Sequence, residues 1–154
     1  HYQWNMDVVG VPGMEAEAEV ISAIIDFFDQ VGLTSEDVSI KLSNRKLLQS
    51  LVDAFGVGGD LFPQVCVCVD KLGKIPNEAI VAELVGLGVA EGVAAQIVHL
   101  VAEGSFEDYK QALTEAAGGD GEDKRLEVLS EIEQLLGILD ARGYGEWVEF
   151  DGSI

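Results

Sequence analysis

Two kinds of apolar spacing divide this chain into segments, and their order limits the folds that it can adopt. Strict alternation of apolar and polar side chains, which is typical of half-buried strands, occurs in residues 1–9, 37–43 and 146–150. Helical spacing of apolar side chains occurs in residues 14–32, 45–55, 77–86, 89–103, 105–117 and 124–143. Strand-like segments therefore flank an all-helical middle. This order predicts an α+β domain that is interrupted by a small helical insertion.

The segment LFPQVCVCVDKL, residues 61–72, can be read in two ways. Its centre, VCVCV, has the β-branched composition that favours a strand. Phe62, Val65, Val69 and Leu72 nevertheless recur at a spacing that suits a helix. Periodicity alone does not decide so short a run, so both readings stay open at this point.

The charge of the chain excludes one class of function. It has 28 acidic and 9 basic residues, for a net charge of −19, and residues 76–154 carry 17 acidic against 4 basic residues, which is a net charge of −13. Such a surface repels phosphate backbones, so we expect no nucleic-acid binding by this chain alone. The apolar runs are shorter than the roughly 18 residues that a membrane span needs. No secretory leader pattern is present, and we expect no membrane association or secretion.

Three polar side chains at the start of the chain form a candidate binding site. Gln3, Asn5 and Asp7 lie two residues apart, so on a strand they project from one face. A carboxylate there could bind an ammonium or imidazolium group, and an amide could orient a second polar group. The alternative is a strand with one solvated face, which is common in antiparallel sheets. Spacing alone leaves both possibilities open.

Other residues that could carry chemistry lack the partners that a site needs. We interpret His99 as a boundary or packed histidine, because no partner spacing accompanies it. Cys66 and Cys68 form an isolated C-x-C pair, which predicts two small buried thiols and no zinc site. Lys41, Arg45 and Lys46 form the one compact basic group, and we expect ordinary surface charge there. The sequence contains no P-loop, G-x-S-x-G or H-E-x-x-H motif.

Several segments, in order, resemble the histidyl-tRNA synthetases, which are class II aminoacyl-tRNA synthetases. The stretch HYQWNMDVVG is similar to the second strand of the family's motif 2, with Gln3, Asp7 and Gly10 at the positions of its Gln, acidic residue and Gly. VSIKLSNRKLLQSLVDAFGV, VCVCVDKLGKIP and EWVEFDGSI are similar to later segments of the family. The last of these resembles the strand that precedes the family's histidine-binding R-G-L-x-Y-Y-T-G loop. The resemblance covers nearly the whole chain.

The resemblance implies a fold and assigns roles to two residues. It implies part of a class II antiparallel sheet with flanking helices, and a helix over residues 61–72. It divides the chain into a partial catalytic core over residues 1–75, a helical insertion domain over 76–125, and a return to the core over 126–154. In the family, the Gln and the acidic residue of motif 2 contact the bound histidine, and the acid holds its α-ammonium. Carried over, these roles fall on Gln3 and Asp7, and no residue is assigned to catalysis or to a metal.

The resemblance also implies a reaction and its partners. The full-length enzyme would activate histidine with ATP, using Mg²⁺, transfer it to tRNA(His), and act as a homodimer in the cytoplasm, a plastid or a mitochondrion. The motif 2 arginine that binds ATP, motif 1 and motif 3 would lie outside these 154 residues. We therefore expect this chain to be an internal fragment that binds no cofactor and is inactive by itself. The alternative functions are a non-catalytic regulatory relative and, less favoured, an independent acidic scaffold.

Overall fold

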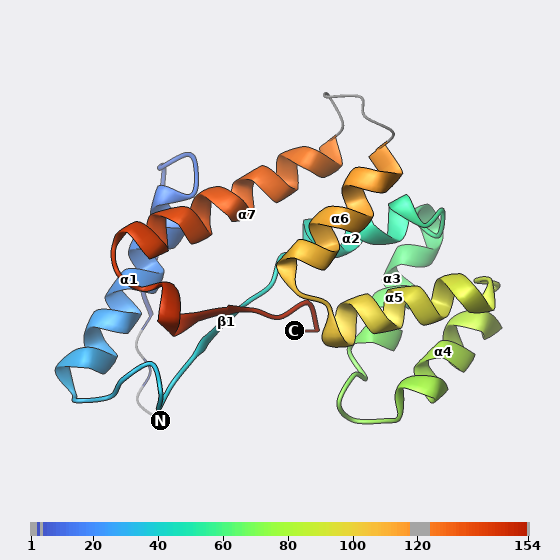
Figure 1. The fold of residues 1–154 in the computed structure, drawn as a ribbon, viewed down its shortest axis with the longest axis horizontal. Coiled ribbons are helices and arrows are strands. Elements are labelled where there is room, and N and C mark those ends of the chain that lie inside the picture. The colour runs from blue at the N-terminus through green and yellow to red at the C-terminus, as the bar shows by residue number, and fades with distance from the viewer. Residues whose placement is uncertain (1–2, 4, 118–123, 154) are drawn as a thin grey trace. The chain divides into compact units, whose positions relative to one another are not determined.

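The computed structural model describes residues 3, 5–117 and 124–153 (Figure 1). The chain divides into two compact units, each with buried apolar residues of its own. One unit consists of His1–Ile40 and Leu129–Glu149, and the other consists of Lys41–Val128 and Phe150–Ile154. The helices and strands below are therefore given unit by unit.

Helix α1 (Glu15–Gln30) is the first element of the first unit. Glu15 and Glu17 lie in its first turn, where the helix dipole stabilises negative charge. The helix stops before Gly32, whose φ of 87° lies in the left-handed region that glycine adopts without strain. The predicted helix is confirmed. Its buried face carries Ile21 and Ile25, as the apolar spacing predicted.

The chain after helix α7 (Lys124–Ala141) is tied to α1 by side-chain hydrogen bonds within the first unit. The guanidinium of Arg142 donates from Nη1 to the Ser22 hydroxyl over 2.9 Å. The Tyr144 hydroxyl donates to the Asp26 carboxylate over 2.5 Å, just before the short 3₁₀ turn η2 (Gly145–Trp147). These bonds hold the chain after α7 against α1.

The second unit is mainly helical (Figure 1). Its helices are α2 (Arg45–Ala54), α3 (Phe62–Val69), α4 (Asn77–Gly86), α5 (Glu91–Glu103) and α6 (Phe106–Ala117), with a 3₁₀ turn η1 (Gly59–Leu61) before α3. Helix α4 packs against α5 and α3, and α2 packs against α5 and α6. The three helical segments predicted after Pro76 are confirmed as α4, α5 and α6. The glycine-rich stretch AAGGDGED, residues 116–123, lies largely in 118–123, outside the described residues.

Two local features of the second unit depend on the sequence of short segments. The side chain of Asn44 accepts hydrogen bonds from the backbone N–H groups of Lys46 and Leu47, and so caps α2. The ambiguous segment 61–72 contains helix α3, as the resemblance implied. Phe62, Val65, Cys68 and Val69 are its buried residues, so burial of one helical face outweighs the β propensity of VCVCV.

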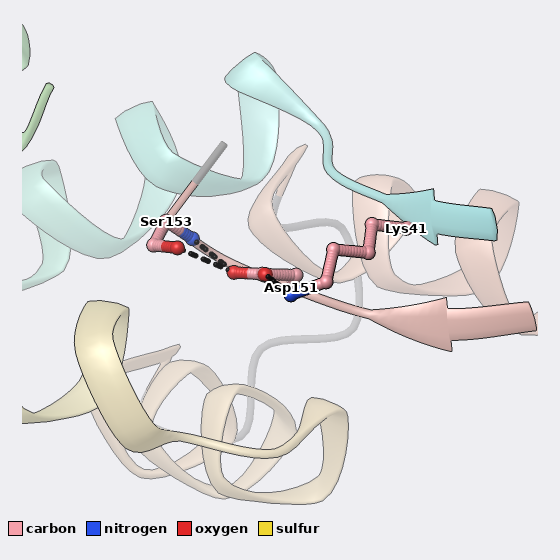
Figure 2. A network of polar contacts seen from close by, with 3 residues as sticks. All are labelled: Lys41, Asp151 and Ser153. Carbon is pink, nitrogen blue, oxygen red and sulfur yellow. Dashed lines mark hydrogen bonds and ion pairs between the residues drawn. The ribbon is translucent and has the colours of Figure 1, made fainter. Parts of the chain in front are cut away.

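The strands that the structure describes are short. Strand β1 (Ile40–Leu42) pairs with β2 (Val148–Phe150), and the two arrows point the same way in Figure 2. The predicted strands at 37–43 and 146–150 are thus confirmed over three residues each, and they form a parallel pair. A mixed structure of helices and strands is confirmed. The antiparallel class II sheet, by contrast, is not seen among the described residues.

The predicted strand over residues 1–9 is wrong for the residues that the structure describes. Residues 3 and 5–9 have no regular secondary structure. A strand is stable only when a neighbouring strand takes up its backbone N–H and C=O groups, and β1 and β2 pair with each other. Alternation in the sequence therefore indicated which side chains are apolar. It did not ensure that a neighbouring strand would pair with residues 1–9.

The compact units do not follow the predicted domain boundaries. The sequence places residues 45–69 in a catalytic core that ends at residue 75. In the structure, α2 and α3 pack with α4, α5 and α6 in one unit. The division at residues 75 and 125 therefore stays a prediction about the family's domains, distinct from the compact units of this chain.

A small polar network joins β1 to the residues after β2 in the second unit (Figure 2). The Lys41 ammonium lies 2.7 Å from the Asp151 carboxylate, and the Ser153 hydroxyl and backbone N–H both donate to the same carboxylate. The Asp151 backbone N–H also donates to the Leu42 carbonyl over 2.9 Å. One residue of the predicted basic group is thus part of a specific ion pair.

Asp151→Asn is expected to destabilise the chain at neutral pH and to matter less in acid. The Lys41 ammonium, followed by Ser153, lowers the pKa of Asp151 to about 2. Because the unfolded carboxyl titrates near ~3.9, the network stabilises the fold above about pH 4, and this contribution is lost as pH falls towards 2. Since Lys41 is 51% exposed, solvent screening limits the loss at pH 7 to about 1 kcal/mol.

Urea unfolding of wild type and Asp151→Asn at pH 7, 4 and 2.5 measures this difference. The exposed Asp60 of η1 offers a matched control, and Asp60→Asn is expected to change the free energy of unfolding by less than ~0.5 kcal/mol. A difference between wild type and Asp151→Asn that stays constant from pH 7 to pH 2.5 would contradict the role given to the ion pair.

Candidate functional site

The predicted site residues Gln3, Asn5 and Asp7 are all exposed in the structure. The Gln3 side-chain amide donates from Nε2 to Asn5 Oδ1 over 3.0 Å. Two of the three side chains are therefore in direct contact, although the segment is not a strand. Sequence spacing alone gave no reason to expect this hydrogen bond.

A hollow of about 410 Å³ lies between this segment and helix α1, inside the first unit. Its lining consists of Asn5, Met6, Asp7, Val20 and Ile24. Val20 and Ile24 are one helical turn apart on α1 and half-buried, so they form a continuous apolar wall. The Asp7 carboxylate and the Asn5 amide thus share a hollow whose other walls are apolar.

A second hollow of about 260 Å³ lies beside the first along α1. Val8, Ala16, Glu17, Val20 and Ile21 line it, so Val20 borders both hollows. The two hollows show that residues 5–8 run alongside α1. The sequence did not indicate this arrangement, because no pattern in it links Val20 to residues 5–8.

The lining of the larger hollow determines which ligands it can hold. An ionised carboxylate accepts hydrogen bonds only, and an amide can both donate and accept. Asp7 is therefore suited to a cationic group, while the apolar wall suits a hydrocarbon or ring portion. A small molecule with a cationic group close to an apolar or aromatic body fits this chemistry, and an amino acid such as histidine is one example.

The other candidate residues do not form a site among the described residues. His99 is 70% exposed on α5, with its Nδ1 3.4 Å from the Glu103 carboxylate, so of the two predicted readings, a boundary or a packed histidine, the packed one is wrong. The buried residues next to it on α5 are Ile97 and Val98. Cys66 and Cys68 are free thiols, of which only Cys68 is buried. Partial loss of solvent at Cys66 and burial of Cys68 raise the pKa of both thiols, so both stay protonated at neutral pH.

Arg45 of the basic group contacts an aromatic ring and a sulfur, and the acidic side chains form no metal site in the described ranges. The Arg45 guanidinium stacks over the Phe62 ring, 5.9 Å from its centroid, and its Nη2 lies 4.0 Å from the Cys66 sulfur. In residues 3, 5–117 and 124–153, no three His, Cys, Asp or Glu side chains are arranged to hold a metal ion. Within the same residues, no helix is both long and apolar enough to span a membrane.

Comparison with known proteins identifies the family. A sequence model described as histidyl-tRNA synthetase matches residues 1–152. This chain belongs to the histidyl-tRNA synthetase family. The resemblance found in the segments from HYQWNMDVVG to EWVEFDGSI is therefore confirmed.

Individual relatives agree with the family match. The chain is 42% identical over its whole length to a chloroplastic/mitochondrial histidine–tRNA ligase of Arabidopsis thaliana. It is 33% identical, over 99% of the chain, to a cytoplasmic histidine–tRNA ligase of Dictyostelium discoideum. It is 30% identical, over 94% of the chain, to histidine–tRNA ligase 1 of Bacillus anthracis. The matched regions make up 30%, 32% and 32% of these relatives, so the chain spans about a third of their length.

Proposed function

We propose that this chain forms part of a histidine–tRNA ligase, an enzyme that activates histidine with ATP and transfers it to tRNA(His). The match of the family over residues 1–152 carries this proposal. Each of the relatives named above is a histidine–tRNA ligase, which favours the enzyme over a non-catalytic regulatory relative. The antiparallel class II sheet, the domain division at residues 75 and 125, and a homodimer belong to the proposal for the longer protein.

In this proposal Asp7 and Gln3 bind the histidine substrate. Asp7 lines the hollow beside α1, and its carboxylate is suited to the α-ammonium group through a charge-assisted hydrogen bond. The Gln3 amide is hydrogen-bonded to Asn5, which lines the same hollow as Asp7. The remaining donor and acceptor positions of the Gln3 amide can contact a second polar group of the substrate. The apolar wall formed by Val20 and Ile24 limits the access of water to the bound molecule and so strengthens both contacts.

ATP and Mg²⁺ are part of the proposed reaction, but the described acidic residues form no cation site, and Lys41 and Arg45 are engaged in other contacts. Lys41 is paired with Asp151 and Arg45 is stacked on Phe62, so neither is arranged around a phosphate. The described acidic residues provide no cluster for a cation. We therefore place the ATP and Mg²⁺ sites in other parts of the longer protein. The proposed location is the cytoplasm or an organelle, since the relatives include both kinds.

Aminoacylation kinetics of the longer protein that contains this chain test the proposal. Wild type is expected to charge tRNA(His) with histidine. Asp7→Asn removes the charge but keeps the shape, and is expected to raise the histidine KM by about 10- to 100-fold without changing the ATP KM. Asp60→Asn, at an exposed aspartate outside the hollow, is the matched control and is expected to leave both KM values unchanged.

Two results would contradict parts of this proposal separately. An intact, folded longer protein that does not charge tRNA(His) would overturn the ligase function and favour the regulatory alternative. An active enzyme whose Asp7→Asn variant keeps the wild-type histidine KM would leave the ligase function in place and overturn the role of Asp7. The 154-residue chain alone is expected to show no ATP–pyrophosphate exchange above background.

A further inference from the structure

Asn5 is the polar side chain of the hollow to which neither the sequence nor the family assigned a role. It lines the hollow together with Asp7, and Met6 between them contributes to the apolar lining. Asn5 is also in contact with Gln3, because its Oδ1 accepts the hydrogen bond from Gln3 Nε2 over 3.0 Å. Asn5 therefore connects the two residues that are proposed to bind histidine.

The hydrogen bond from Gln3 determines which part of the Asn5 amide is available to a ligand. An asparagine amide has one oxygen, which accepts, and one NH₂ group, which donates two hydrogens. In this hydrogen bond Gln3 donates and the oxygen of Asn5 accepts, so the oxygen is directed towards Gln3. The amide nitrogen then lies on the opposite side of the group. Asn5 thus offers a hydrogen-bond donor in the same hollow that is lined by Asp7, whose carboxylate only accepts.

We propose that Asn5 binds the amino acid substrate directly, by donating a hydrogen bond from Nδ2 to an acceptor atom of the substrate while Asp7 holds its cationic group. This inference rests on the proposed function and adds a binding residue to the same site. Gln3 then also acts as a positioning residue, because it fixes the orientation of the Asn5 amide. The ligand class that matches this donor and acceptor pair is a small molecule with a cationic group and a hydrogen-bond acceptor close together.

Both polar groups face an apolar surface, which increases their effect on binding. Val20 and Ile24 of α1 line the same hollow, so a ligand seated there packs against apolar side chains beside the Asn5 and Asp7 contacts. Hydrogen bonds are stronger in such an environment, and an unpaired donor costs more. An acceptor on the ligand is therefore favoured at Asn5, whereas a ligand that presents a second cationic group there is disfavoured.

Two variants of Asn5 in the longer, active protein test this proposal by the relative size of their effects on the histidine KM. Asn5→Ala removes the donor and is expected to raise the histidine KM about 5- to 10-fold, with kcat and the ATP KM unchanged. Asn5→Asp has nearly the same shape but replaces the donor with a charged acceptor. It is expected to raise the histidine KM more than Asn5→Ala does, because it repels the acceptor atom of the substrate.

The outcomes separate this proposal from a general structural role and from the proposed function. Gln30→Ala, at an exposed amide at the end of α1, is the matched control and is expected to change no kinetic parameter. An Asn5→Asp variant that binds histidine as tightly as wild type, or more tightly, would overturn the donor role. Equal losses in kcat and in the melting temperature for both variants would also overturn it, since they indicate a folding defect. Inactive wild-type protein would overturn the proposed function itself.

Discussion

Leu84→Ala is expected to lower the free energy of unfolding of this chain by about 2–5 kcal/mol. Leu84 lies on α4 and is completely buried, and α4 packs against both α5 and α3. Removing three side-chain carbon atoms there takes away apolar burial and leaves a cavity that the surrounding helices fill only partly. Urea unfolding followed by circular dichroism measures the loss.

Val85, the next residue of the same helix, offers a matched control. Its side chain is 40% exposed, so Val85→Ala is expected to change the free energy of unfolding by at most ~0.5 kcal/mol. Hydrogen exchange adds a local measurement, because the amides of α4 and α5 should lose protection in Leu84→Ala. Similar stabilities for Leu84→Ala and Val85→Ala would contradict the packing of α4 described here.

The helical middle of the chain could be predicted from its sequence because local signals determine it. Gly86 ends α4 and Gly104 follows α5, close to the predicted ends, and the apolar spacing between these breaks is that of a helix. The Asn44 cap of α2 is another local signal, since its side chain bonds to the backbone two and three residues later. Helices form their backbone hydrogen bonds within one segment, so nearby residues suffice to specify them.

The strands and the first nine residues were harder to predict, because strands depend on partners distant in the sequence. The segment 37–43 alternates over seven residues, yet only Ile40–Leu42 is paired, against Val148–Phe150. Residues 3 and 5–9 alternate equally well and form no strand. Alternation describes which side chains are apolar, whereas the length and direction of a strand depend on its neighbour.

The candidate site was predictable in its composition but not in its geometry. Two-residue spacing indicated a polar group of Gln3, Asn5 and Asp7, and the family resemblance selected Gln3 and Asp7. The hydrogen bond between Gln3 and Asn5 and the hollow shared by Asn5 and Asp7 depend on how the segment lies against α1. Neither spacing nor resemblance contains that information, which is why Asn5 acquired a proposed role only from the structure.

The close approach of Tyr109 to Gly152 leads to the second large effect. Tyr109 of α6 is 1% exposed, and its ring packs edge-on against Phe150, with centroids 5.2 Å apart. A Cβ atom added to Gly152 would lie 2.2 Å from the Tyr109 hydroxyl oxygen. Gly152→Ala is therefore expected to lower the free energy of unfolding by about 1–3 kcal/mol through overpacking. Gly152 does not adopt a positive φ, so backbone conformation does not require a glycine there. The lack of space beside Tyr109 is the reason that a larger residue is unfavourable.

The Tyr109 hydroxyl explains how the two residues are coupled. It is buried, with no hydrogen-bond partner among the described residues, and burial raises the pKa of Tyr109 so that it stays protonated. Tyr109→Phe removes an unsatisfied polar group and is expected to be neutral or to stabilise the chain by about 1 kcal/mol. The double variant Tyr109→Phe, Gly152→Ala should then recover at least ~1 kcal/mol of the loss caused by Gly152→Ala alone.

Gly86→Ala distinguishes this steric effect from a general intolerance of alanine. Gly86 closes helix α4 and has no atom within 4 Å of an added Cβ, so the substitution is expected to be neutral or to stabilise the chain by about 0.5–1 kcal/mol. Urea unfolding of the wild type and these four variants gives the complete double-mutant cycle and its control. Purely additive effects of Tyr109→Phe and Gly152→Ala would mean that the hydroxyl and Gly152 are not in contact, because additivity is expected only of residues that share no interaction.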